Sequence, residues 1–160
     1  MFQISKFINP HIYKGKLIKY TFWYLINNFF INSSFPFSKI KVFFLKSFGA
    51  KIGRNVIIKD NVNIKFPDKL IVNNNVWIGS YVWIDNIEKV EIDSNCCISQ
   101  GVYMCTGNHD YKKETFDLIA EEIKINKNCW LGAKSIIGPG VNLKENSILK
   151  LGSIVTKSNL

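Results

Sequence analysis

Aliphatic residues recur every six positions near the C-terminus of this sequence, a spacing that fits neither an α-helix nor a flat strand. The series is Ile125, Leu131, Ile137, Leu143, Leu149 and Val155. Residues common in turns directly follow several of these positions, as at Asn126, Gly132 and Gly138. A period of six with one inward aliphatic side chain per repeat is typical of a parallel β-helix, in which each short strand ends at a corner. We expect each corner to need a residue that tolerates an unusual φ.

The same spacing extends upstream, interrupted by two insertions of two residues. One insertion lies at Phe66-Pro67-Asp68 and the other near Glu88, and the aliphatic positions around them are Ile52, Ile58, Ile64, Val72, Ile78, Ile84, Ile92, Ile98 and Met104. Aromatic residues stand at the last position of several repeats, at Trp77, Trp83, Tyr103 and Trp130. We expect these rings on the outer faces of the coil, at a packed trimer seam or in a ligand groove, because large exposed apolar patches are unusual on monomers. The fold class is therefore all-β.

The first 50 residues follow a different pattern. Residues 1–15 form an irregular lead-in, and residues 16–31 and 38–48 each predict an amphipathic helix. The apolar run of the first helix is too short and too polar to span a membrane. We expect residues 1–50 to cap the open end of the β-helix formed by residues 51–160. The outer face of these helices, residues 16–48, is a candidate for peripheral membrane contact.

Between Met104 and Ile125 the six-residue count is lost, so residues 106–122 are predicted to leave the coil as a loop. Long excursions from a rigid scaffold often carry function. The loop contains His109, whose imidazole can accept a proton near neutral pH. Asp110 is a candidate to fix the tautomer of His109, and a nucleophile-and-base pair of Cys105 with His109 is an alternative. The other histidine, His11, is too far away in the sequence to suggest a metal site.

Composition narrows the choice of partner and compartment. The formal net charge of +9 favours an anionic partner, which is a nucleic acid, an acidic membrane surface or a phosphate-bearing cofactor. Nucleic acid ranks last, because the basic residues form no dense cluster. The four cysteines lack CxxC spacing and are expected to be free thiols in a reducing compartment. The N-terminus does not resemble a secretory signal, so a cytoplasmic location is expected.

Several segments together resemble the left-handed β-helix O-acetyltransferases, and in particular the colanic acid biosynthesis (WcaF-like) group. This group is related to the maltose, galactoside and nodulation acetyltransferases. The resemblance rests on the hexapeptide repeats and on five motifs, namely Ile98-Ser99-Gln100-Gly101, Thr106-Gly107-Asn108-His109-Asp110, Phe116-Asp117-Leu118-Ile119, Trp130-Leu131-Gly132-Ala133 and Gly138-Pro139-Gly140-Val141. It covers nearly the whole chain, from about residue 15 to residue 157.

The resemblance implies a homotrimer that binds acetyl-CoA between neighbouring coils. His109 would deprotonate a sugar hydroxyl, which attacks the thioester directly without an acyl-enzyme, and the Ala133 N–H would stabilise the oxyanion. The remaining site residues follow from matching positions. Trp130, Gly132, Ala133, Lys150, Thr156 and Lys157 would contact the cofactor, with Lys150 in place of the family's usual glycine. Asp85, Asn86, Asn108 and Asp110 are candidates for acceptor binding.

The function expected from the sequence is therefore O-acetylation of a sugar in a surface polysaccharide or its lipid-linked precursor. Two alternatives stay open. The same scaffold could acetylate an amino sugar on nitrogen, because an amine acceptor also has to lose a proton. A non-catalytic β-helix binding module is the alternative from outside the enzymes.

Overall fold

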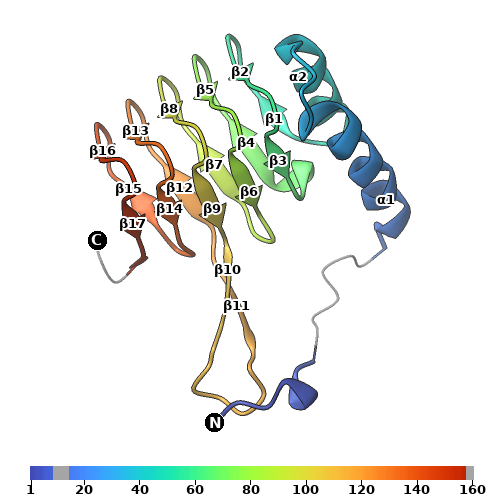
Figure 1. Cartoon of the computed structure of the whole chain (residues 1–160), viewed down its shortest axis with the longest axis vertical. Coiled ribbons are helices and arrows are strands. Elements are labelled where there is room, and N and C mark those ends of the chain that lie inside the picture. The colour runs from blue at the N-terminus through green and yellow to red at the C-terminus, as the bar shows by residue number, and fades with distance from the viewer. Residues whose placement is uncertain (9–14, 158–160) are drawn as a thin grey trace.

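The computed structural model describes residues 1–8 and 15–157, so His11 and Pro10 lie outside the described residues. Within those ranges the body is a parallel β-helix with three faces, each a five-stranded parallel sheet (Figure 1). Sheet A contains β1 (Lys51–Ile52), β4 (Leu70–Val72), β7 (Val90–Ile92), β12 (Ile123–Ile125) and β15 (Asn142–Leu143). Sheet B contains β2 (Ile57–Ile58), β5 (Trp77–Ile78), β8 (Cys97–Ile98), β13 (Trp130–Leu131) and β16 (Ile148–Leu149). Sheet C contains β3 (Asn63–Ile64), β6 (Trp83–Asp85), β9 (Tyr103–Cys105), β14 (Ile136–Ile137) and β17 (Ile154–Val155).

The predicted inward positions form the core. Consecutive aliphatic residues of the six-residue series lie in sheets A, B and C in turn, so each third member stacks in the same column. Ile78, Ile98 and Leu131 form part of the column of sheet B and are fully buried. Leu149 is half-buried, because it lies near the C-terminal end of the coil. The hexad prediction is confirmed for every strand of the three sheets.

The corners differ from the prediction in one respect. Positive φ occurs three positions after most of the aliphatic residues, as at Asn128 and Lys134, and not directly after them. Among the described residues, the exceptions are Ile64, Ile84 and Met104, which precede the two insertions and the arm. Gly132, which directly follows Leu131, is required for another reason, since a Cβ there would lie 2.6 Å from the carbonyl oxygen of Leu149 in the next coil. Asparagine fills many of the positive-φ positions, because its short polar side chain tolerates the left-handed conformation.

One corner carries a ladder of asparagine side chains along the coil. The amides of Asn55, Asn75, Asn95, Asn128 and Asn146 bond in sequence, with N···O distances of 3.0, 3.1, 3.3 and 3.0 Å. Each amide therefore links its own coil to the next. This ladder stacks polar groups outside the core in the same register as the aliphatic columns inside it.

The N-terminal helices close one end of the coil. The helix expected over residues 16–31 is α1 (Leu17–Ile26) continued by a π-helical turn, η2 (Asn27–Ile31), and the second helix is α2 (Ser38–Ser47). The Trp23 indole donates to the Ile64 carbonyl at 2.8 Å and fixes α1 on the coil. Lys41 of α2 is fully buried and donates to the carbonyls of Ile31 and Lys59, and burial lowers the pKa of its ammonium group. None of the described helices is long and apolar enough to cross a membrane.

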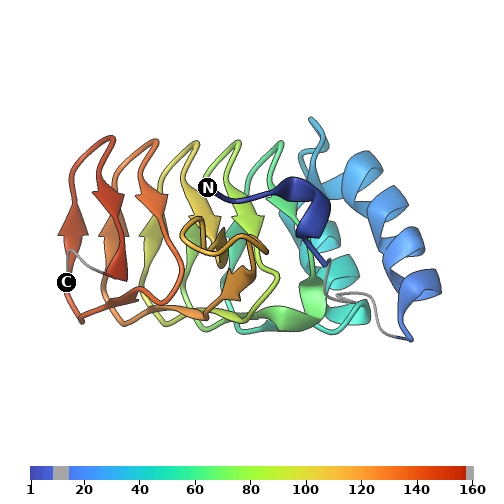
Figure 2. The same ribbon diagram turned by 90° about the horizontal axis from the view of Figure 1, so that it is seen from below.

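Two features lie outside the prism. The segment predicted as a loop is a two-stranded antiparallel arm, β10 (Gly107–His109) and β11 (Leu118–Ala120), which projects from the coil after β9 (Figure 1). The first residues of the chain include a 3₁₀ turn, η1 (Ile4–Lys6), and lie near the tip of this arm (Figures 1 and 2). A second 3₁₀ turn, η3 (Pro67–Lys69), accommodates the first insertion.

Candidate active site

His109 is the last residue of β10 and faces the return of the arm. Its Nδ1 lies 2.9 Å from the carbonyl oxygen of Phe116. A carbonyl oxygen can only accept a hydrogen bond, so the neutral imidazole carries its proton on Nδ1 and presents an unprotonated Nε2. This tautomer is the one that a general base requires, with Nε2 free to take a proton.

Phe116 holds the imidazole in two ways. Its ring stacks on that of His109 with centroids 4.3 Å apart and planes inclined by only 3°, while its carbonyl binds Nδ1. The backbone of Phe116 has a φ of 49°, in the left-handed region where aromatic residues are uncommon. The unusual backbone and the contact with the candidate base coincide at one residue, which assigns Phe116 a positioning role. The motif that contains Phe116 was recognised in the sequence, but nothing there indicated this role.

The polar residues close to His109 in the sequence form hydrogen bonds with groups other than its imidazole. Asp110 does not orient the imidazole, because its carboxylate accepts from the Lys112 N–H at 3.1 Å and the Phe116 carbonyl occupies Nδ1. The Asn108 side chain accepts from the backbone N–H of His109 at 2.8 Å. The Cys105 thiol donates to the Gly107 carbonyl at 3.0 Å, so the alternative pair of Cys105 with His109 gains no support.

Asp85 and Asn86, the further candidates for acceptor binding, differ in the groups that they contact. Lys65 Nζ lies 2.8 Å from Asp85 Oδ1, a Coulombic contact whose geometry is not that of a hydrogen bond, and the Tyr103 hydroxyl donates to Oδ2 at 3.4 Å. Burial, with Cys105 and Asp85 nearby, raises the pKa of Tyr103. Asn86 is fully buried, and its amide bonds both the N–H and the carbonyl of Phe66. Asn86 therefore holds two coils together and does not face an acceptor.

The residues expected to bind the cofactor lie on sheet B and the C-terminal coils. The Trp130 ring is 49% exposed on the outer face of sheet B, and its Nε1 donates to Ser99 Oγ at 2.9 Å. The N–H groups of Gly132 and Lys134 bond to Leu149 and Gln100, whereas the Ala133 N–H has no acceptor among the described residues. This amide is therefore available to an external acceptor.

The lysines at the C-terminal end are exposed. Lys157 pairs with Glu121, which follows the arm, at 3.0 Å, and Lys150 lies on the corner after β16. Thr156 is half-buried beside Lys157. Within one chain, the arm that bears His109 projects away from the prism face that bears Trp130 (Figure 1). The two halves of the predicted site are thus on separate elements.

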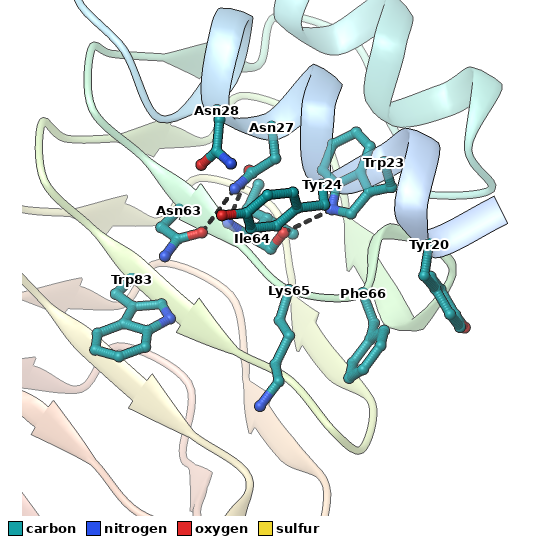
Figure 3. Close-up of a pocket in the computed structure, with 10 residues that line it drawn as sticks. All are labelled: Tyr20, Trp23, Tyr24, Asn27, Asn28, Asn63, Ile64, Lys65, Phe66 and Trp83. Carbon is teal, nitrogen blue, oxygen red and sulfur yellow. Dashed lines mark hydrogen bonds between the residues drawn. The ribbon is translucent and has the colours of Figure 1, made fainter. Parts of the chain in front are cut away.

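A cavity of about 300 Å³ lies where α1 meets sheet C, and the sequence did not predict it (Figure 3). Tyr24 and Trp83 provide exposed rings, and Asn28, Asn63 and Lys65 provide polar groups. None of the residues that line it is a histidine. The cavity combines stacking and hydrogen-bonding groups but lacks a base of the kind found on the arm, so the arm is the better candidate for the catalytic centre.

Comparison with known proteins identifies the family of the chain. No protein-family model matches the chain. The colanic acid biosynthesis acetyltransferase WcaF of Escherichia coli K12 is 33% identical over 160 residues, which is 99% of this chain and 88% of that protein. The galactoside O-acetyltransferase of the same organism is 27% identical over 116 residues, 71% of this chain and 57% of that protein.

Solved structures share the fold. A hexapeptide-repeat acetyltransferase of Vibrio cholerae, solved with acetyl coenzyme A, superposes with a TM-score of 0.76 at 17% identity, over 89% of this chain and 77% of that one. A maltose O-acetyltransferase of Clostridium difficile gives a TM-score of 0.73 at 22% identity, over 98% and 88% of the two chains. Together with the identity to WcaF over almost the entire chain, the stacked hexapeptide coils show that this protein belongs to the left-handed β-helix, hexapeptide-repeat acetyltransferases, in the WcaF branch.

Proposed function

We propose that this acetyltransferase moves an acetyl group from acetyl-CoA to a sugar hydroxyl of a surface polysaccharide or its lipid-linked precursor. The observation that carries the proposal is the fixed tautomer of His109, whose Nδ1–H is held by the Phe116 carbonyl. A base presented in this way suits removal of a hydroxyl proton. The choice of a glycan acceptor rests on the relationship to WcaF.

In the proposed reaction, His109 Nε2 takes the proton of the acceptor hydroxyl as its oxygen attacks the thioester carbon. The Ala133 N–H donates to the oxyanion that develops on the carbonyl oxygen. The C–S bond then breaks, and the His109 imidazolium returns its proton to the departing thiolate. Stacking on Phe116 favours the first proton transfer, from the hydroxyl to Nε2, because an aromatic face attracts the positive charge of the imidazolium that forms.

The side chains of the C-terminal coils are of types that suit the binding of acetyl-CoA. When bound, the cofactor supplies an activated acetyl group as a thioester. The exposed ring of Trp130 offers an apolar wall, and Lys150 and Lys157 are exposed cations suited to its phosphates as point charges. Gly132 lets adjacent coils approach closely beneath this wall.

A homotrimer would bring the two halves of the site together. The outward row of sheet A is largely polar, at Lys51, Ile71, Glu91, Lys124 and Asn142. The row of sheet B is mostly apolar, at Ile57, Trp77, Cys97, Trp130 and Ile148. In sheet C the row is Asn63, Trp83, Tyr103, Ile136 and Ile154. Apolar rows on two faces support packing of neighbouring chains through sheets B and C, with the arm of one chain reaching the Trp130 face of another.

The proposed acceptor also suggests peripheral contact with the inner face of a membrane. The large apolar residues Ile18, Phe22, Leu25 and Phe29 are exposed along α1 and η2, opposite the buried Tyr20, Trp23, Asn27 and Ile31. An exposed apolar stripe on a strongly basic protein suits an anionic lipid surface, where lipid-linked glycans reside.

The test is substitution of the base. His109→Ala should lower kcat by about a hundred- to ten-thousand-fold, because proton transfer to a positioned base contributes that much. Release of the CoA thiol in the presence of a panel of sugars measures transfer, and His11→Ala, which removes the other imidazole, is the matched control. Near-normal transfer by His109→Ala would remove His109 from its role. Including amino sugars in the panel separates O-acetylation from N-acetylation, and absence of any CoA binding by calorimetry would favour the non-catalytic alternative.

A further inference from the structure

The first eight residues, here called the N-terminal segment, contact the arm rather than the coil. Phe2 stacks on Phe116 with centroids 4.5 Å apart and an interplanar angle of 27°. The Gln3 N–H donates to the Glu114 carbonyl at 2.9 Å, and Lys6 Nζ lies 2.5 Å from Glu114 Oε2. Figures 1 and 2 both show the segment lying along the tip of the arm. Ring, backbone and charge contacts therefore attach the segment to the element that carries His109.

Phe7 brings the segment to the candidate base itself. The centroid of its ring lies 5.2 Å from that of the His109 imidazole, and the two planes are inclined by 71°. Phe7 and Phe116 are 6.5 Å apart, whereas Phe116 lies 4.3 Å from the imidazole. These separations place Phe7 beside the stack and not opposite Phe116. The imidazole is thus supported on one face by the arm and from another side by the N-terminal segment.

We propose that the N-terminal segment is part of the active site and that Phe7 is a positioning residue for His109. The bond to the Phe116 carbonyl and the stack on Phe116 both tie the imidazole to the arm, but the arm itself projects from the coil. Phe7 adds a contact from outside the arm, and the bonds at Glu114 keep the segment in place. This inference rests on the proposed role of His109 as base.

The first test measures the imidazole directly, without a transferase assay. In a His11→Gln background His109 is the only histidine, and its unprotonated nitrogen reacts with diethyl pyrocarbonate. Phe7→Ala should raise the rate of carbethoxylation about two- to tenfold, the range that an aromatic pair contributes. Phe7→Tyr, which keeps the ring, should react at the parental rate. Ile8→Ala is the matched control, because Ile8 is 85% exposed in the same segment.

The second test measures turnover with whichever sugar supports CoA release. Phe7→Ala should lower kcat about two- to tenfold and leave KM for acetyl-CoA unchanged, and Phe7→Tyr should restore kcat. The inference is overturned if Phe7→Ala matches Ile8→Ala in either measurement, or if kcat rises, which would make the segment a cover over the base. Retention of transfer by His109→Ala would instead sink the proposed function, and the carbethoxylation rates would still report whether Phe7 holds the ring.

Discussion

At the scale of single residues, neighbouring groups fix the tautomer of the candidate base and the protonated form of a core thiol. His109 is held by a carbonyl and a ring that both belong to Phe116, at an unusual backbone φ of 49°. The surroundings of the Cys96 thiol in the core favour its protonated form. Cys96 stacks in the small inward column above Val76, is 2% exposed and donates to the Asn126 carbonyl at 3.1 Å. Burial raises the pKa of Cys96 from 9.0 to about 11.

The shifted pKa of Cys96 predicts a loss of stability in alkali. The unfolded thiol ionises near pH 9 while the folded thiol stays protonated to about pH 11, so its contribution is complete below pH 9 and declines above it. By pH 10, one unit above the pKa of the unfolded thiol, the free energy of unfolding should fall by about 1.4 kcal/mol, the energy that corresponds to one pKa unit. Cys96→Val, which repeats the buried Val76 of the adjacent coil, should remove this part of the decline. Urea unfolding at pH 8, 9 and 10 measures it.

A control separates Cys96 from the adjacent Cys97. Cys97 is half-buried in the outward row, next to Cys96 in sequence, and Cys97→Ser should keep the alkaline decline of the parent protein. Restricting the comparison to pH 10 and below limits the contribution of Tyr20, whose pKa burial and Asp68 raise to about 12. Equal declines for the parent protein and Cys96→Val would contradict the prediction.

At the scale of elements, α1 with η2 presents two apolar stripes and uses only one of them inside the chain. The buried stripe is anchored by the Trp23 indole on the Ile64 carbonyl and by Asn27, which bonds Asn63 and Ile64. The opposite stripe contains Phe22 and Phe29, 60% and 71% exposed. A second apolar partner would bury this stripe, and the proposed partner is a membrane surface.

The membrane proposal predicts a difference between two neighbouring positions. Phe22→Asp should abolish flotation of the protein with anionic phospholipid vesicles, because it places a charge within the apolar stripe. Thr21→Asp adds the same charge at an exposed position beside the stripe and should weaken flotation only modestly. Parent protein that fails to float with the vesicles, or two variants that float equally, would contradict contact through this stripe.

The elements also show which parts of the fold and of the candidate site could be predicted from the sequence. A period of six is a local property, so it located the strands and their inward residues from Ile52 to Val155. The arm has no such period, and its hairpin depends on the pairing of β10 with β11 and on the left-handed Phe116, neither of which has a sequence signal. His109 was identified as the candidate base, but its partner was sought in adjacent Asp110 and is the carbonyl of Phe116. Contacts between distant segments, such as Phe7 with His109, leave no pattern in a single sequence.

At the scale of the whole molecule, the three faces of the prism divide the surface into one polar and two apolar sides. Sheet A exposes Lys51, Glu91 and Lys124, whereas sheets B and C expose tryptophan, tyrosine and isoleucine at the corresponding positions. Association through sheets B and C would bury these rings and leave sheet A in solvent. In the proposed trimer each active site would then combine the arm of one chain with the Trp130 face of another.

One pair of substitutions tests this arrangement. Ile136 is 39% exposed in the outward row of sheet C, and Ile71 occupies the equivalent row of sheet A. Ile136→Asp should convert a trimer, three times the 18.4 kDa chain, to the monomer mass, because a carboxylate buried at an apolar interface loses its hydration. Ile71→Asp makes the same chemical change on the polar face and should leave the trimer mass in light scattering. If the site is shared between chains, Ile136→Asp should also lose transfer activity while its fold persists by circular dichroism. A monomeric parent protein at micromolar concentration, or loss of the trimer only in Ile71→Asp, would contradict assembly through sheets B and C.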